Sequence, residues 1–326
     1  MANTAVTYMG LQLANPIIVS SSSLTQDVDG VVKLADAGAG AVVLKSLFEE
    51  QIEYDTGQAA DDVDFGSHPE AADYITEMGK HLGPAGYLDL IKEARDSVDI
   101  PVIASVNCTS PRWWLTYGRQ IEQAGADGLE LNIAIMPQVD DDPRDLERRY
   151  VRIVRDVRAE TDLPLAVKIG PVFTNTGQMA SALADAGADA IVLFNRFYQL
   201  DIDTARAQIS PGVQFSASEE IAIPLRWVSL LANAIDCDIA ASTGVHTGDD
   251  AVKMLLAGAN AVQVCTTVYR NGPEQIARIV AEISHWMDAH DHAEIDGFRG
   301  ALSQSQSKAP ERYERLQYIK ALTGRS

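Results

Sequence analysis

The chain has 326 residues, with 46 acidic against 26 basic side chains and a formal net charge of −20. A hydrophobic content of 46%, with 23 glycines and 13 prolines, is ordinary for a globular protein and excludes a disordered, collagen-like or coiled-coil chain. The acidic excess argues against a surface for nucleic acid or anionic membrane, because both need clustered Lys and Arg to neutralise phosphate.

The N-terminus, residues 1–8, has neither the basic segment nor the apolar run of a signal peptide. No apolar run in the chain approaches the roughly 18 residues needed to span a bilayer. The three cysteines, Cys108, Cys237 and Cys265, are far apart and form no C-x-x-C motif, which argues against zinc and iron–sulfur sites. We therefore expect a reduced, cytoplasmic protein without a metal site.

A short pattern of Ala and Gly followed by an apolar run occurs four times, at 37–46, 124–133, 186–195 and 257–266. Each copy follows an amphipathic stretch, so the pattern predicts a helix that leads directly into a buried strand. The second residue of each copy is a glycine that can adopt the left-handed conformation and end the helix. These glycines are Gly38, Gly125, Gly187 and Gly258.

Four further apolar runs alternate with these copies, at 16–19, 101–106, 164–169 and 238–241. The strands are continuously apolar, as parallel strands covered on both faces should be. Eight strands alternating with helices predict a TIM (β/α)8 barrel, an α/β fold, occupying residues 1–302 as one domain. The expected helices lie near 28–38, 87–97, 113–124, 144–159, 176–186, 224–235, 248–257 and 273–290.

The chain is longer than the roughly 250 residues of a minimal barrel, and two segments account for most of the excess. Residues 47–86 follow the second strand and are acidic, and we expect an extended, functional loop there. Residues 303–326 are expected to be a linker, 303–310, and a final helix, 311–323, packed on the barrel.

Polar side chains follow nearly every predicted strand, at the end of the barrel where active sites of this fold lie. Lys168 interrupts an apolar strand and indicates function, because Lys is almost never buried without a partner. Lys45 is a weaker candidate, since a long side chain can extend to solvent. The asparagines also suit turns and the serines also suit a plain loop. The candidate set is Ser20, Ser21, Lys45, Ser46, Asn107, Asn132, Lys168 and Asn195.

The last two strand ends predict a phosphate site. Gly244 lets the backbone approach a ligand closely, and Thr247 to Asp249 open the next helix. Loops after strands 7 and 8 of such barrels often bind phosphate through backbone N–H groups and a helix N-terminus. Val245 lies beside the glycine, and Thr266 and Thr267 can add hydroxyl groups. The phosphate can belong to a cofactor or to a substrate.

From Asn15 to about Thr267 these motifs resemble the FMN-dependent dihydroorotate dehydrogenases, in the class 1-like form that has no membrane helices ahead of the barrel. The matching segments, in order, read NPIIVSS at 15–21, VLKS at 43–46, LELN at 129–132, AVKIGP at 166–171, TGV at 243–245, and AGA and VQVCTT between 257 and 267.

The resemblance implies an FMN lying across the mouth of the barrel. Ser20, Ser21, Lys45, Ser46, Asn107, Asn132, Lys168 and Asn195 would contact its ring and ribityl chain, and Gly244, Val245, Thr266 and Thr267 would hold its phosphate. Lys168 would stabilise negative charge on reduced flavin, and Lys45 would face a substrate carboxylate. The implied activity is CH–CH oxidation by hydride transfer, as in pyrimidine biosynthesis. A homodimer and an electron-transfer partner accompany this expectation.

One departure concerns the catalytic base, which the family supplies as Cys or Ser in the loop after strand 4. Ile135 occupies that position here, which places the chain in a divergent, dihydroorotate dehydrogenase-like branch. Substitute bases are Cys108, Glu49 and the run Asp140–Asp142, although packing explains Cys108 better and a solvated loop explains the Asp run better.

Other departures affect binding. Pro137 replaces one substrate-binding asparagine, and Thr243 replaces the first glycine of the phosphate loop. Two alternatives therefore stay open: a flavin-bearing redox subunit without dihydroorotate activity, and a phosphate-binding barrel lyase in which a lysine forms a Schiff base.

Overall fold

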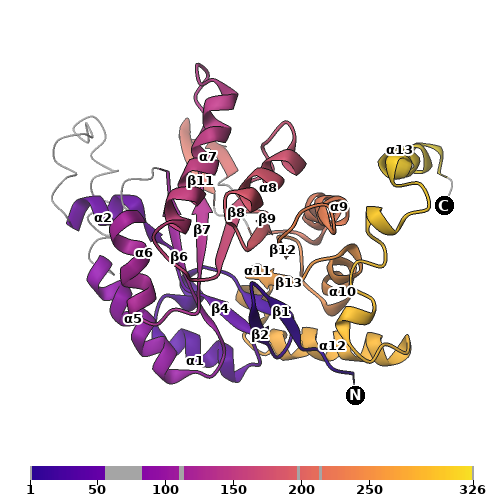
Figure 1. Ribbon diagram of the computed structural model, residues 1–326, viewed down its shortest axis with the longest axis horizontal. Coiled ribbons are helices and arrows are strands. Elements are labelled where there is room, and N and C mark those ends of the chain that lie inside the picture. The colour runs from indigo at the N-terminus through magenta and orange to yellow at the C-terminus, as the bar shows by residue number, and fades with distance from the viewer. Residues whose placement is uncertain (1, 56–82, 110–113, 197–198, 213–214, 325–326) are drawn as a thin grey trace.

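The computed structural model describes residues 2–55, 83–109, 114–196, 199–212 and 215–324, and its centre is a closed barrel of eight parallel strands. The sheet runs β4-β3-β13-β12-β9-β8-β7-β6-β5, and the pairing of β4 with β6 closes it (Figure 1). The predicted TIM barrel is confirmed. Its strands are β3 (Ile17–Val19), β4 (Ala41–Val43), β6 (Val102–Cys108), β7 (Gly128–Ile133), β8 (Leu165–Ile169), β9 (Ala190–Leu193), β12 (Asp238–Ser242) and β13 (Ala261–Val264).

The strands carry almost only buried Val, Ile, Leu and Ala, so the barrel wall is the core of the molecule. Its register brings predicted site residues into line: Asn107 on β6 pairs with Asn132 on β7, and Asn132 pairs with Lys168 on β8. Residues that are 25 and 36 positions apart in sequence thus become neighbours across adjacent strands.

Helices surround the strands (Figure 1) and begin and end close to the predicted positions. The glycines of the four repeats have φ angles of 90°, 91°, 109° and 120°, which confirms that each ends a helix in a conformation that favours glycine. The helices around the barrel are α1 (Val28–Asp36), α2 (Glu49–Asp55), α5 (Pro84–Ser97), α6 (Trp114–Gln123), α7 (Pro143–Arg158), α8 (Thr176–Asp185), α9 (Ala222–Leu231), α10 (Gly248–Ala257), α11 (Thr266–Asn271) and α12 (Gln275–Ala289).

The structure adds elements that the apolar pattern did not predict. Two antiparallel hairpins lie outside the barrel sheet, β1–β2 (Val6–Tyr8, Leu11–Leu13) and β10–β11 (Gln199–Asp203, Gln208–Gly212). Their strands have three to five residues, too short for a clear periodicity. The extended loop predicted at 47–86 begins instead with β5 (Leu47–Phe48) and α2, and residues 56–82 lie outside the described part.

The C-terminal segment continues through short 3-10 turns into α13 (Tyr313–Thr323), at the outer edge of the molecule in Figure 1. Arg226 of α9 donates to Glu314 at 2.6 Å, and the Tyr313 hydroxyl donates to the Leu302 carbonyl oxygen at 3.2 Å. The division into a barrel over 1–302 and an appended helix stays a prediction. Within the described ranges, no helix is long and apolar enough to cross a bilayer.

Candidate active site

The predicted site lysine on β8, Lys168, is buried inside the barrel and makes polar contacts with three other strands. Its Nζ donates to Ser20 Oγ at 2.9 Å and to Gln263 Oε1 at 2.8 Å. Glu130 Oε1 lies 3.7 Å from the same nitrogen. The burial of a lysine in an apolar strand is thus explained by a carboxylate and two oxygen acceptors.

Glu130 and Gln263 complete this buried group, and neither is among the residues predicted from the sequence. Gln263 Nε2 donates to the second carboxylate oxygen of Glu130 at 2.5 Å. Glu130 Oε1 accepts no hydrogen bond within the described residues, and neither does the hydroxyl of buried Tyr8. Burial, followed by the negative charge of Glu130, raises the pKa of Tyr8 well above its usual value. An acidic residue inside the apolar run LELN is the signal that identifies Glu130.

The hydroxyl candidates lie together at the ends of β3 and β4. Ser46 N donates to Ser21 Oγ at 2.8 Å, and the two hydroxyl oxygens are 3.0 Å apart. Ser46 Oγ is also 2.7 Å from Ser105 Oγ on β6, so the hydroxyls form a chain across the barrel wall.

The amide candidates form a second group on the neighbouring strands. Asn195 Nδ2 donates to Asn132 Oδ1 at 2.8 Å, and both residues are half-buried. Asn107 is half-buried beside Asn132, its partner in the β6–β7 register. The arrangement leaves amide groups at the mouth of the barrel that can donate to, or accept from, a planar heterocycle.

Lys45 differs from Lys168 in its surroundings. Its side chain is exposed, and Nζ donates to Gln26 Oε1 at 3.5 Å, a long contact. The two candidate lysines are therefore one buried charge with close polar partners and one exposed charge at the rim.

The predicted phosphate end consists of a tight backbone turn and two threonines. Gly244 and Val245 are buried, and their N–H groups make no hydrogen bond within the described residues. Thr267 Oγ1 donates to the His246 carbonyl oxygen at 3.0 Å, and Thr266 Oγ1 accepts from Ser216 N at 3.3 Å. Two free backbone donors in a buried turn suit a phosphate group.

The N-terminus of α10 does not match the expectation that it would help bind the phosphate. The N–H groups of His246 and Thr247 donate to Asp250 Oδ2, each at 3.1 Å. Gly248 N donates to Glu282 Oε2 of α12 at 2.6 Å. Because carboxylates already occupy these donors, the helix start is capped by the chain itself.

Gly244 is expected to be needed for the shape of this turn. It has φ +80°, and an added Cβ would lie 2.3 Å from Ile221 N, so the close approach is to the chain and not only to a ligand. Gly38 has φ +90° but nothing within 4 Å of an added Cβ, which makes it the matched control. We expect Gly38→Ala to lower the free energy of unfolding by about 1–2 kcal/mol, and Gly244→Ala by about 1–3 kcal/mol more. Urea unfolding measures both, and equal losses would contradict the predicted clash.

The position of the family's catalytic base is apolar in the structure. Ile135 is 5% exposed in the loop between β7 and α7, and Met136 beside it is 45% exposed. Of the substitutes, Asp140–Asp142 are exposed, which fits a solvated loop. Glu49 is buried and accepts from Thr109 N at 2.6 Å and Thr109 Oγ1 at 3.0 Å. The side chain of Cys108 lies outside the described part.

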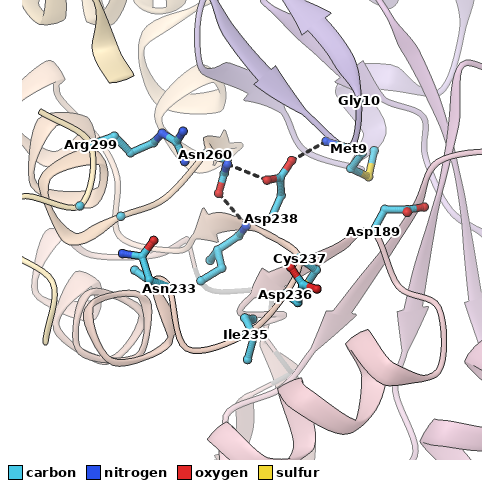
Figure 2. Close-up of a pocket in the computed structure, with 14 residues that line it drawn as sticks. Met9, Gly10, Asp189, Asn233, Ile235, Asp236, Cys237, Asp238, Asn260 and Arg299 are labelled. Atoms are coloured by element: carbon cyan, nitrogen blue, oxygen red, sulfur yellow. Dashed lines mark hydrogen bonds between the residues drawn. The ribbon is translucent and has the colours of Figure 1, made fainter. Parts of the chain in front are cut away.

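A cavity of about 470 Å³ lies at the opposite, N-terminal end of the strands (Figure 2). Asp238 lies at its wall, with Oδ2 accepting from Met9 N at 2.8 Å and Oδ1 accepting from Asn260 Nδ2 at 2.7 Å. Burial is the main reason that the pKa of this carboxyl is raised above 3.8. These bonds tie the first hairpin to the barrel floor, as expected for the stabilising face of a TIM barrel.

The raised pKa of Asp238 should be detectable in how the free energy of unfolding depends on pH. Its pKa is higher in the folded than in the unfolded chain, so the folded state binds the proton more tightly. The cost of the ionised carboxylate is fully present above the raised pKa and is relieved as the pH falls toward 3.8. We expect the unfolding free energy of the wild type, minus that of Asp238→Asn, to increase on acidification from neutral pH. Urea unfolding at several pH values measures it, and a decrease would contradict the assignment.

The comparison with known proteins agrees with the geometry. The profile of the family described as dihydroorotate dehydrogenase matches residues 3–287. A Methanothermobacter thermautotrophicus protein is 29% identical over 89% of this chain and 95% of its own length. Relatives from Thermoplasma acidophilum and Pyrococcus furiosus are each 28% identical over 88% of this chain and 95% and 94% of their own. All three are named dihydroorotate dehydrogenase B (NAD(+)), catalytic subunit.

The family profile covers most of the chain, and the structure is a closed (β/α)8 barrel with a buried lysine on one of its strands. The chain therefore belongs to the dihydroorotate dehydrogenase family.

Proposed function

We propose that the chain is an FMN-dependent oxidoreductase that transfers hydride between the flavin and a small, unsaturated or CH–CH substrate. The observation that carries the proposal is the buried Lys168, held 2.9 Å from Ser20 Oγ and 2.8 Å from Gln263 Oε1 beneath a mouth lined with amides and hydroxyls. A fixed cation in a dry site stabilises charge that develops on a bound ring.

The donor set fits FMN. The ring would lie over Lys168 and the Asn132–Asn195 pair, and the free N–H groups of Gly244 and Val245 would face the phosphate. FMN supplies the hydride acceptor when bound. Lys168 would then offer an ammonium to the negative side of the ring, and the half-buried Ser21–Ser46 pair would offer hydroxyl groups beside it. The remaining proposed contacts are Ser20, Lys45, Asn107, Thr266 and Thr267.

The exposed lysine at the rim supports a substrate that carries a carboxylate. Lys45 is exposed and only loosely bound to Gln26, so its ammonium can turn toward an anion without breaking a strong contact. Dihydroorotate is such a substrate. The relatives are named catalytic subunits, which supports a second subunit that receives the electrons. A homodimer in the cytoplasm completes the proposal.

The visible spectrum of the purified protein tests the flavin. We expect yellow protein, or colourless apoprotein that becomes yellow on reconstitution with FMN, and bleaching on reduction. Apoprotein that takes up no FMN in a fluorescence titration would contradict the proposal. Gly38→Ala protein, altered at the opposite end of the barrel, is purified and reconstituted in parallel. It serves as the matched control for FMN that is lost during purification.

A second candidate, a flavin-bearing redox subunit without dihydroorotate activity, is favoured by one observation. Ile135 is buried where the family places its base, and its side chain can accept no proton. Stopped-flow mixing with dihydroorotate distinguishes the two: bound flavin that is reduced supports the dehydrogenase, and flavin that stays oxidised with dihydroorotate but is reduced by a chemical donor supports the redox subunit.

The lyase alternative receives less support. A Schiff base needs a free amine, whereas Lys168 Nζ donates to two oxygens and faces the Glu130 carboxylate. Borohydride treatment with a carbonyl substrate checks this point, and we expect no covalent adduct on Lys168.

A further inference from the structure

A buried carboxylate lies directly behind the Lys168 ammonium and has no role in the function proposed so far. Glu130 on β7 is 1% exposed, and its Oε1 lies 3.7 Å from Lys168 Nζ without accepting a hydrogen bond from any described residue. Burying a charge is costly unless a partner compensates it. Glu130 and Lys168 compensate one another inside the barrel.

The side chain of Gln263 joins the two charges in a defined order. Its Nε2 donates to Glu130 Oε2 at 2.5 Å, and its Oε1 accepts from Lys168 Nζ at 2.8 Å. An ionised carboxylate can only accept, so Gln263 has to present its NH2 group to Glu130 and its carbonyl oxygen to Lys168. The same oxygen accepts from Ser20 Oγ at 3.1 Å, which fixes the second acceptor of the lysine as well.

We propose that Glu130 is a positioning residue, which acts through Gln263 and through its own charge to hold the Lys168 ammonium fixed beneath the flavin. This inference rests on the proposed FMN site. Lys168 would contact the ring, and Glu130 would act on it only through Lys168. Without the carboxylate, the buried ammonium loses its counter-charge and the Gln263 amide loses one of the three partners that orient it, so the lysine is no longer held in place.

The affinity of the protein for reduced FMN relative to oxidised FMN measures the effect, because the ammonium interacts more strongly with the negatively charged reduced ring. We expect Glu130→Gln to lower this ratio about tenfold, which corresponds to a midpoint potential about 30 mV more negative for the two-electron couple. Glu130→Asp keeps the charge and should retain a ratio close to that of the wild type. A redox titration of bound flavin, combined with fluorescence titration of the apoprotein, gives both numbers.

A double-mutant cycle distinguishes positioning from a general loss of packing. If Glu130 acts through Lys168, the change in ratio caused by Glu130→Gln should vanish in the Lys168→Met background, because residues that act on one another are not additive. A ratio that is unchanged or increased in Glu130→Gln overturns the inference, and so does an equal effect in both backgrounds. Should Glu130→Gln not fold, Gln263→Met decides, since it removes the bonds to both charges and has to lower the ratio.

FMN binding by the wild type distinguishes a failure of the proposed function from a failure of the role assigned to Glu130. Wild-type protein that binds no FMN contradicts the proposed function and this inference with it. Wild-type protein that binds FMN, with a ratio that neither Glu130→Gln nor Gln263→Met changes, contradicts only the role of Glu130.

Discussion

Lys168→Met is expected to weaken the binding of reduced FMN by about 100-fold and that of oxidised FMN by about tenfold, because a charge-assisted contact contributes about 1.5–3 kcal/mol. Lys45→Met is the matched control, since it removes an exposed ammonium from the same end of the barrel. Because Lys45 is exposed, its loss should weaken the binding of oxidised and reduced FMN far less than the loss of Lys168, and it should raise the KM for a carboxylate substrate. Equal losses of FMN affinity in both variants would contradict the assignment of Lys168 to the ring.

The same substitution should destabilise the fold. Removing one member of a buried ion pair typically costs about 3–5 kcal/mol, because it leaves the other charge uncompensated. Here the carboxylate left without its partner would be that of Glu130, which is 1% exposed. Adding Glu130→Gln to Lys168→Met should restore part of the unfolding free energy without restoring FMN affinity. Urea unfolding of the apoproteins measures this, and a double variant less stable than Lys168→Met would contradict the pairing.

The second large effect concerns the missing base. Replacing Ile135 with Cys restores a proton acceptor in the loop after β7, and a placed general base contributes about 10²–10⁴-fold. We therefore expect dihydroorotate to reduce the bound flavin of Ile135→Cys protein at least about 100-fold faster than that of the wild type. The rate should rise with pH as the thiol loses its proton. Stopped-flow absorbance at the flavin band gives the rate.

Met136→Cys is the control for this gain. It introduces the same thiol one position further along the same loop, at a side chain that is 45% exposed. A general base has to lie within hydrogen-bond reach of the proton that it removes. A similar gain from both variants would indicate a non-specific thiol effect, and no gain from Ile135→Cys would favour the redox subunit over the dehydrogenase.

The barrel was predictable because its signals are local. The repeat that contains Gly38, Gly125, Gly187 and Gly258 combines a helix stop with a buried strand over about ten residues, and each φ angle agrees with it. The short hairpins carry no such periodicity. Local patterns determine the order and type of these elements, and the parallel register then follows from the closed sheet.

The candidate site was predictable only in part, for a physical reason. Lys168 attracts attention because it interrupts an apolar strand, but its partners come from strands that are 95 and 148 residues away in sequence. The capping of α10 by Glu282, 34 residues further along, was equally hidden. Pairings of this kind depend on the closed tertiary structure, which no local pattern encodes.

The buried polar group inside the barrel also links the cofactor site to the completion of folding. Ser20 is synthesised well before its acceptor Gln263, which follows it by 243 positions. Contacts of such separation form late, because the loop entropy has to be overcome first. A nascent or truncated chain without β13 would lack the amide that orients Lys168. Flavin uptake would therefore report that the whole barrel has closed, so that an incompletely synthesised chain stays colourless.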